Sequence, residues 1–396
     1  MINRIRILVI LMLLNRKVQI IVSREEYEMN LHDIAALSKV KYELPMIDAY
    51  VLELDEILLN KLVQSYQDWH IEMDTHITAQ MNRASDIIEL KWAHEHGYYG
   101  ENVSVAILDT GISLHGDFLV NGENRRIIAF KDILNNRAEL YDDNGHGTHV
   151  AGIVGGSGAA SKGRYVGVAP RCNFVIVKVL NYKGDGNISD VLAGLQWVMD
   201  NQKKYNIQIV NISVGTSTRE NVDENSLLVK AVDAVWNRGM VVVVAAGNNG
   251  PGPMSISTPG ISRKVITVGS SDDSIPVELF GNRVTDYSGR GPTGACIKKP
   301  DIVAPGSNIV SCNAAKNFSK MRSTPFFKND YMLYTVKSGT SMATPIVSGA
   351  IALLLSAYPE MTNKDVKIKL RSSARDLGYG WEKQGWGLLN IPNLLR

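Results

Sequence analysis

The chain has 396 residues, of which 45% are hydrophobic, and its 42 Lys and Arg against 40 Asp and Glu give a formal net charge of +2. This length provides a substantial buried core, in two domains or in one large α/β domain with an appendage. The near balance of charge provides no strongly basic surface, so we expect neither a nucleic-acid partner nor a membrane partner.

The cysteines and an N-terminal apolar run bear on the cellular compartment. Cys172, Cys296 and Cys312 are too sparse and too widely spaced for a disulfide framework or a zinc-binding pattern. The apolar run Ile7–Leu14 follows two arginines, but NRKVQ comes next where a signal peptide would have small residues, and the run is too short to span a bilayer. We therefore expect a cytoplasmic protein, with secretion as the alternative.

Residues 1–82 are expected to form a small α+β unit. Three stretches with strand character, KVQIIVS, MIDAYVLELDE and WHIEMDTHI, are separated by segments with helical spacing such as DEILLNKLVQSY. The unit is either an ordinary N-terminal subdomain or a folding aid that is later cut off. The polar stretch Thr78–Asp86 is expected to link it to a second domain, residues 83–396.

From residue 100 onward, buried strands alternate with helices. The apolar, β-branched runs are NVSVAILDTG, NFVIVKVLN, IQIVNISVG, MVVVVAAGN and KVITVGS, and helical segments such as SDVLAGLQWVMDN and NSLLVKAVDAVWNRG lie between them. Strands that are apolar on both sides belong in a parallel sheet covered on both faces. The pattern predicts an α/β fold with a doubly wound, mostly parallel sheet and helices on both faces.

Several of these strands end in small or polar residues, namely Asp109–Gly111, Ser213–Gly215 and Gly247–Gly250. In doubly wound sheets, ligands bind beyond the carboxyl ends of the strands. We therefore expect the functional site at this edge of the sheet.

An aspartate, a histidine and a serine stand in glycine-rich surroundings that would let a substrate backbone approach. They are Asp109 in AILDTGI, His146 in NGHGTHVAG and Ser341 in SGTSMATP. A serine hydroxyl is a weak nucleophile at neutral pH and needs a base such as histidine, which in turn needs an acceptor on its far nitrogen. Taken singly, Asp109 fits a turn and Ser341 a helix cap equally well.

Ser341 opens an apolar helical stretch, SMATPIVSGAIALLLSAYP, and so lies at a helix N-terminus, where unpaired N–H groups favour negative charge. Asn248, in the sequence AAGNNG at the end of a strand, would add a side-chain donor to an oxyanion hole there. Alone, Asn248 fits a turn residue just as well.

The stretch YDDNGHGTHVAG also has the elements of a metal site, because His146 and His149 lie near Asp142 and Asp143. Helical zinc sites, however, use histidines at i and i+4 with a glutamate between them, and this spacing is i and i+3. We expect no metal, a buried structural His149, and the two aspartates at a solvated loop edge. The loop Gly155–Arg164 lacks the Gly-Lys-Ser/Thr ending of phosphate-binding loops and is expected at the surface.

The strings AILDTGI, NGHGTHVAGI, NISVGT, VVAAGNNG and SGTSMATP resemble, in this order, the motifs of the subtilisin-like serine proteases, over residues 97–392. The sequences YDDNGHGTH, YSGRGP and KPDIVAPG are most similar to those of bacterial intracellular members. The resemblance implies a serine endopeptidase acting through an acyl-enzyme, with Asp109 as orienting acid, His146 as general base, Ser341 as nucleophile and Asn248 as oxyanion donor.

The resemblance also implies an extended peptide or unfolded protein as substrate, paired with strand edges beside the cleft. The matching edges are Ser213, Val214 and Gly215 on one side and Gly184, Asp185 and Gly186 on the other. The floor of the first specificity pocket would be Ala245, Ala246 and Gly247. These small, uncharged residues favour an apolar or aromatic substrate side chain.

Two parts of the chain depart from the family pattern. Asp117 matches a calcium ligand of secreted relatives, but VGGSGAASKGRYVGVAP lacks their Asn-rich ligand loop, so the resemblance does not support structural calcium there. Residues 1–82 only loosely resemble the inhibitory propeptides of the family. As a propeptide, the unit would template folding of the non-local sheet and act as an intramolecular inhibitor until self-cleavage between about Met73 and Ile88.

Two alternatives remain open. One is a catalytically silent, protease-like binding or signalling module. The other is an esterase or a processing peptidase with a single dedicated substrate, because the same triad serves acyl transfer generally.

Overall fold

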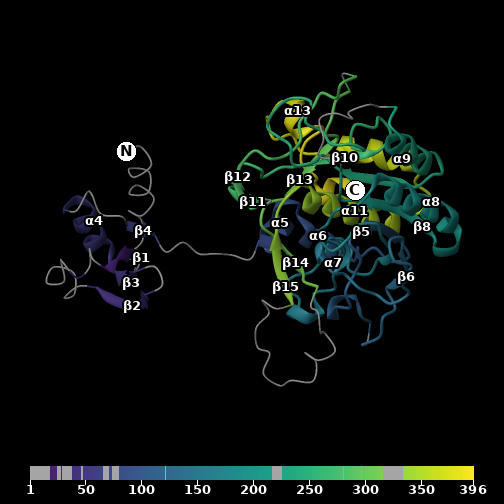
Figure 1. Ribbon diagram of the computed structural model, residues 1–396. Coiled ribbons are helices and arrows are strands. Elements are labelled where there is room, and N and C mark those ends of the chain that lie inside the picture. The colour runs from purple at the N-terminus through teal and green to yellow at the C-terminus, as the bar shows by residue number, and fades with distance from the viewer. Residues whose placement is uncertain are drawn as a thin grey trace. The chain divides into compact units, whose positions relative to one another are not determined.

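The computed structural model describes residues 18–24, 28, 38–45, 48–65, 71–73, 80–120, 122–215, 225–279, 281–295, 297–314 and 333–396. The apolar run 7–14, Cys296 and the first part of the predicted linker lie outside these ranges. The chain divides into two compact units, Met1–Thr78 and Ala79–Arg396, which are drawn in Figure 1.

The first unit is a four-stranded antiparallel sheet with one helix. In spatial order its strands are β2 (Lys39–Leu44), β3 (Ala49–Leu54), β1 (Val18–Ser23) and β4 (Ile71–Met73), and the helix is α4 (Glu56–Ser65). Alternate residues of β1 and β3, such as Ile20 and Leu52, pack with Leu58 and Leu62 of α4 in a separate core. We predicted β1, β3, β4 and α4 from the sequence but missed β2, although its mostly exposed residues KVKYEL alternate polar and apolar side chains.

Seven parallel strands form the central sheet of the second unit. In spatial order they are β13 (Ile302–Ala304), β10 (Ile266–Ser270), β9 (Val241–Ala245), β8 (Ile207–Ile212), β5 (Ser104–Asp109), β7 (Asn173–Lys178) and β6 (Ile127–Asp132). The chain begins at β5, builds β6 and β7 on one side, and then continues from β8 to β13 on the other. The strand order therefore reverses at β5, and such a switch point is where open α/β sheets bind ligands.

Helices cover this sheet. All six residues of β5 are buried, so both faces of the sheet are covered at its centre. Helix α7 (His146–Gly155) packs against α11 (Thr340–Ala357), whereas α8 (Ile188–Tyr205) packs against α9 (Leu227–Asn237). The predicted α/β fold, with its parallel sheet and small N-terminal α+β unit, is confirmed.

Helix α11 is the central core helix. Among the described residues it is the one helix long and apolar enough to cross a membrane by length and composition, and 83% of its apolar window is buried within the fold. Its contacts with β8, β9, β10 and α7 account for that apolar character.

Shorter elements complete the second unit. Two antiparallel hairpins lie outside the central sheet, β11 (Val277–Leu279) with β12 (Asn282–Val284), and β14 (Ile309–Cys312) with β15 (Tyr334–Lys337). The remaining helices are α5 (Gln80–Ile87), α6 (Leu90–Glu95), α12 (Asn363–Ser373), α13 (Trp381–Gln384) and α14 (Ile391–Leu395), with 3-10 turns at Gly116–Phe118 and Ala159–Ser161.

The predicted linker Thr78–Asp86 overlaps a helix. Helix α5 takes in most of it, and the predicted boundary after residue 82 falls within this helix. Ala84 and Ile88 are buried in the core of the second unit, so the segment is a packed part of that unit despite its polar composition.

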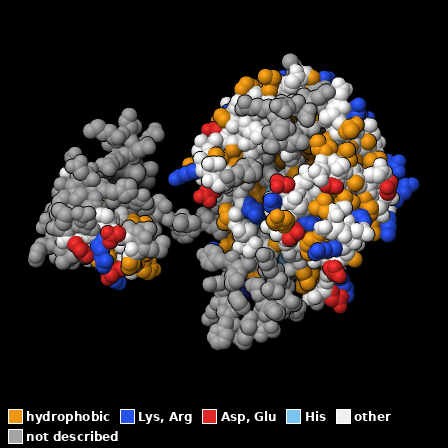
Figure 2. All heavy atoms as spheres, in the orientation of Figure 1, with side chains coloured by type: hydrophobic (Ala, Val, Ile, Leu, Met, Phe, Trp, Pro, Cys, Tyr) orange, Lys and Arg blue, Asp and Glu red, His pale blue; other side chains and the backbone are white. Residues whose placement is uncertain are grey.

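Figure 2 shows Lys and Arg side chains interspersed with Asp and Glu on the visible face.

Candidate active site

Four predicted site residues are carried by elements that meet at the carboxyl edge of the sheet. Asp109 is the last residue of β5, His146 the first of α7 and Ser341 the second of α11, while Asn248 lies in the loop after β9. His146, Ser341 and Asn248 line one cleft of about 440 Å³. The structure thus brings together residues that are far apart in the sequence.

Asp109 and His146 form a close pair. The Nδ1 atom of His146 lies 2.8 Å from Asp109 Oδ1 and 3.0 Å from Oδ2. Asp109 is fully buried, whereas the His146 side chain keeps 23% of its exposure. Burial opposes the imidazolium, but the charge and hydrogen bond of Asp109 outweigh it and raise the pKa of His146. The carboxylate fixes Nδ1 as the protonated nitrogen and leaves Nε2 as the proton acceptor.

This pair depends on a glycine. A Cβ atom on Gly147 would collide with the carbonyl of Gly111 and lie 3.2 Å from the Cβ of Asp109. Only a residue without a side chain lets the first turn of α7 approach the end of β5 this closely. The glycine after His146 therefore sets the separation of His146 and Asp109.

The Ser341 hydroxyl donates a hydrogen bond to the Ser213 carbonyl, with 2.7 Å between the oxygens. Transfer of its proton to His146 thus requires the hydroxyl to rotate away from Ser213. Such rearrangements are common between free enzymes and their substrate complexes. The backbone N–H of Ser341 lies in the first turn of α11, where N–H groups have no acceptor within the helix.

The Asn248 amide is held in one orientation. Its Oδ1 accepts hydrogen bonds from the Thr340 N–H (2.9 Å) and the Thr340 hydroxyl (3.1 Å), which leaves Nδ2 as the donor on the cleft side. Gly339, with φ of 128°, lies so close that a Cβ there would be 3.0 Å from Nδ2. The loop before Ser341 is therefore shaped around this amide.

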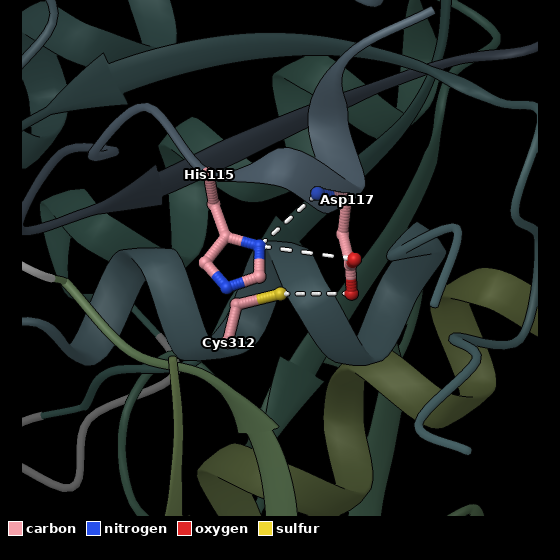
Figure 3. Close-up of side chains that lie close together, drawn as sticks. All are labelled: His115, Asp117 and Cys312. Carbon is pink, nitrogen blue, oxygen red and sulfur yellow. Dashed lines mark hydrogen bonds and ion pairs between the residues drawn. The ribbon is translucent and has the colours of Figure 1, made fainter. Parts of the chain in front are cut away.

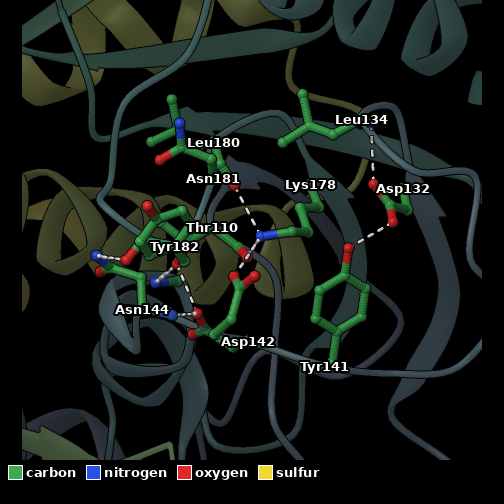
Figure 4. Close-up of polar contacts among 12 residues, drawn as sticks. Thr110, Asp132, Leu134, Tyr141, Asp142, Asn144, Lys178, Leu180, Asn181 and Tyr182 are labelled. Atoms are coloured by element: carbon green, nitrogen blue, oxygen red, sulfur yellow. Dashed lines mark hydrogen bonds and ion pairs between the residues drawn. The ribbon is translucent and has the colours of Figure 1, made fainter.

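Asp142 was expected at a solvated loop edge, and this prediction is wrong. Its carboxylate is buried and accepts a hydrogen bond from the hydroxyl of Thr110 (2.8 Å), which is drawn in Figure 4. It also accepts from both the N–H and the hydroxyl of Thr148 (2.9 and 2.6 Å) and from the Gly145 N–H (2.7 Å). Burial alone would raise the pKa of Asp142, but these hydrogen bonds hold it below its usual value. Asp142 ties the loop before His146 to the residue after Asp109.

Asp143 also has a structural partner. It accepts a hydrogen bond of 2.7 Å from the buried ammonium of Lys178, which also donates to the carbonyls of Thr110 (2.6 Å) and Leu180 (2.8 Å). Lys178 is the strand neighbour of Asp109, on β7. The ammonium thus holds together the segments that follow β5 and β7 and the loop before α7. The apolar run NFVIVKVLN did not reveal this role.

Most of the predicted substrate-binding residues line the cleft, but two do not. Ala246 is fully buried, with its N–H bonded to the Val268 carbonyl, and Gly186 lies beside the Val179 carbonyl. The predicted residues that line the cleft are Gly184, Asp185, Ser213, Val214, Gly215, Ala245 and Gly247. Sequence analysis missed Asn144, Leu180, Leu279 and Ser338, which line it too.

Asp117, matched above to a calcium ligand, lies in a buried cluster with His115 and Cys312, shown in Figure 3. Its Oδ1 accepts from the Ala160 N–H (2.9 Å), and its Oδ2 accepts from the Tyr334 hydroxyl (2.8 Å) and the Cys312 thiol (3.6 Å). Burial raises the pKa of Cys312 well above its ordinary value and lowers that of His115, so both side chains are neutral. A thiol and an imidazole do not suit calcium, which takes six to eight oxygen ligands.

The guanidinium group of Arg126 lies among the backbone carbonyl groups near Asp117. Arg126 donates hydrogen bonds to the carbonyls of Gly155, Pro170 and Asp117 and stacks 5.0 Å from the centre of the Phe174 ring. Carbonyl groups that could ligate a cation are therefore already bonded to a side-chain cation. The residues present do not fit a structural calcium ion at Asp117.

Comparisons with known proteins agree with this geometry. The sequence pattern of the subtilase family (Peptidase_S8) matches residues 100–387. The chain is 37% identical to serine protease AprX of Bacillus subtilis over 343 residues, which cover 85% of this chain and 76% of that protein. It is 31% identical to an alkaline protease of Alkalihalobacillus alcalophilus over 386 residues, covering 96% of this chain and 86% of that protein.

The fold has a similar neighbour among solved structures. The crystal structure of a cold-adapted subtilisin-like serine proteinase superimposes with a TM-score of 0.56 at 30% identity. The match covers 74% of this chain and 90% of that one.

The pairing of Asp109 with His146 predicts a titration that can be measured. In wild type the imidazolium is stabilised by Asp109, so the ring of His146 should titrate above the ordinary pKa of histidine. In Asp109→Asn, burial and the nearby positive charge of Lys337 are opposed only by the weaker effect of the Asp142 charge, and the midpoint should move to lower pH. NMR titration in a Ser341→Ala background, with His146→Gln to assign the signal, measures both. The exposed control Asp200→Asn should leave the midpoint unchanged, and a midpoint that Asp109→Asn also leaves unchanged would contradict the pairing.

The Arg126 cluster predicts stability that is independent of calcium at this site. Arg126→Met leaves buried carbonyls without donors and should lower the free energy of unfolding by about 1–3 kcal/mol, seen as a lower Tm in calorimetry. The exposed control Arg238→Met should change it little. A fall in Tm on treating the wild type with EGTA that disappears in Asp117→Asn would show that calcium binds there after all.

Proposed function

The chain belongs to the subtilase family of subtilisin-like serine proteases, and from that premise we propose that it is an endopeptidase that cleaves extended peptide segments through an acyl-enzyme on Ser341. The observation that carries the proposal is the pairing of His146 with the buried Asp109 at 2.8 Å, in the cleft that Ser341 and Asn248 also line.

Acylation begins when the Ser341 hydroxyl leaves the Ser213 carbonyl and gives its proton to Nε2 of His146. The oxygen attacks the carbonyl carbon of the scissile peptide bond, and the imidazolium that forms is stabilised by Asp109. His146 then passes the proton to the leaving amine as the C–N bond breaks. Water, deprotonated by His146 in the same way, hydrolyses the acyl-enzyme.

The negative charge that develops on the substrate oxygen needs donors already in place. The Nδ2 group of Asn248 and the backbone N–H of Ser341 are the two candidates, and both are held by the loop around Gly339 and Thr340. Because Asn248 Oδ1 is occupied by Thr340, the amide does not reorient during the reaction. Preorganised donors of this kind supply a large part of the rate enhancement of acyl transfer.

Substrate binding would use the two cleft edges, Ser213–Gly215 and Gly184–Asp185. An extended peptide can pair with such backbone edges as an added strand, which recognises the main chain more than the sequence. Ala245, Gly247 and Ser257 line the cleft, and their small side chains leave space in it for a substrate side chain. These features support unfolded or extended protein segments as the substrate class.

We propose that the N-terminal unit is an intramolecular inhibitor that the enzyme removes itself. The unit has its own sheet and core, as a separable folding module would. The alkaline protease match spans 96% of this chain, whereas the crystallised cold-adapted proteinase is 90% covered by only 74% of it. About a quarter of this chain thus lies outside a match that still covers 90% of the related proteinase chain.

The assignment of Ser341 is tested with a fluorophosphonate probe, which forms a covalent bond only with an activated serine. Wild type should be labelled at Ser341, and labelling should be lost in Ser341→Ala and fall by orders of magnitude in His146→Ala. Equal labelling of wild type and Ser341→Ala would disprove the assignment. Turnover of casein beside a panel of small esters distinguishes an endopeptidase from an esterase, which would hydrolyse the esters alone.

Self-processing is tested by intact-mass measurement of purified protein. Wild type should lose its N-terminal unit by cleavage between about Met73 and Ile88, whereas Ser341→Ala should keep its full length. Persistence of the full-length chain in both proteins would exclude self-processing. Adding active wild type to Ser341→Ala then shows whether one molecule can process another.

A further inference from the structure

A hairpin outside the central sheet borders the catalytic cleft. Strands β11 and β12 pair in an antiparallel ribbon, placed at the margin of the second unit in Figure 1. Leu279, at the end of β11, lines the same cleft as Ser341 and Asn248. The hairpin therefore contributes to the walls of the site that the triad occupies.

A second hollow, of about 460 Å³, adjoins the catalytic cleft. Its walls come from the hairpin and from the end of β15, and Ser338 lines both hollows, so they share a border next to the nucleophile. Its lining includes Glu278, Arg283, Asn308, Val336, Lys337 and Ser338.

The direction in which the substrate peptide lies in the cleft determines which half of it contacts this second hollow. The proposed acyl half runs along Ser213–Gly215 and places its side chain against Ala245 and Gly247. The half that leaves as an amine must continue past Ser341 on the other side, toward Leu279 and Ser338. An extended chain advances about 3.3 Å per residue, so its first two residues reach the second hollow.

Positively charged side chains outnumber negatively charged ones in the lining of this hollow. Lys337 and Arg283 supply two cations, and Glu278, the strand partner of Arg283 across the hairpin, supplies one carboxylate. In the part of the chain that the structure describes, neither cation has an ion pair within 4.0 Å. Lys337 is half-buried and Arg283 exposed, and the charge of Lys337 acts on His146.

We propose that Lys337 and Arg283 bind an acidic side chain in the leaving half of the substrate, so that the enzyme prefers Asp or Glu within the first two residues after the scissile bond. This inference rests on the proposed endopeptidase function and adds a substrate preference to it. Lys337 is the principal determinant because Glu278 offsets part of the charge of Arg283. A carboxylate near these cations lowers the energy of both bound substrate and transition state and raises kcat/KM.

The leaving side is isolated from the acyl side by an acyl-transfer assay. One ester substrate acylates Ser341, and an added dipeptide amide competes with water for the acyl group. The amine nitrogen attacks the ester carbonyl, the bond to Ser341 Oγ breaks, an amide bond forms, and the amine proton passes through His146 to Oγ. The ratio of amide to acid product measures binding on the leaving side only, since both routes share the acyl-enzyme and His146.

Two nucleophile pairs provide the measurement, Gly-Glu-amide beside Gly-Lys-amide and Glu-Gly-amide beside Lys-Gly-amide. We expect wild type to favour the Glu nucleophile in at least one pair by about three- to tenfold at low salt, and less in 0.5 M NaCl. Lys337→Glu should abolish or reverse this preference, and the double variant Lys337→Glu, Arg283→Glu should reverse it. Lys230→Glu, on the exposed face of α9, is the matched control and should leave it unchanged.

The outcomes separate the two proposals. Turnover of the ester with the same product ratio for Glu and Lys nucleophiles would overturn the acidic preference and leave the endopeptidase function standing. A preference that survives charge reversal at Lys337 and Arg283 would also overturn it. No turnover of ester or casein by wild type would overturn the proposed function together with this inference. Ester turnover by each variant confirms that it is folded, because the ratio does not depend on the acylation rate.

Discussion

A carboxylate with no exposure to solvent, Asp109, is the constraint on which the site depends. A buried charge is tolerated only when partners satisfy it, and here the Thr110 N–H donates to Oδ1 at 2.8 Å while His146 pairs with both oxygens. The position of Asp109 is set by β5, the strand at which the sheet order reverses. The same topology that builds the core therefore presents this charge at the ligand-binding edge.

A network of buried polar groups holds the neighbouring cleft segments in position relative to Asp109. Asp142 binds the Thr110 hydroxyl and the first turn of α7, while Lys178 binds the Thr110 carbonyl and Asp143. Thr110 is thus held from both sides, directly after Asp109. Partly satisfied networks of this kind destabilise a fold, but a satisfied one makes the geometry unique. The rigidity of the Asp109 and His146 pair follows from that satisfaction.

The order of local motifs was enough to predict the sheet, the helices and the clustering of Asp109, His146, Ser341 and Asn248, because each lies at the end of a strand or the start of a helix. The burial of Asp142 could not be predicted from the sequence, because only the tertiary fold brings its hydrogen-bond donors Thr110 and Thr148 to it. Helix α5 was mistaken for a linker because its polar sequence hides one buried side chain, Ala84, which lies in the core with Ile88 just after the helix. The strand β2, which pairs with β3, was overlooked although its residues KVKYEL alternate polar and apolar side chains as a strand does.

One cation near the site, Lys337, acts on His146 in opposition to Asp109. Asp109 stabilises the imidazolium, and Lys337 destabilises it through space. A carboxylate bound beside Lys337 would screen that charge, so His146 would hold a proton more firmly while the leaving half of a substrate is present. The gain is a stronger base for attack by Ser341, and the cost is a weaker acid toward the leaving amine. In the proposed mechanism, Lys337 would therefore couple occupancy of the second hollow to the proton affinity of His146.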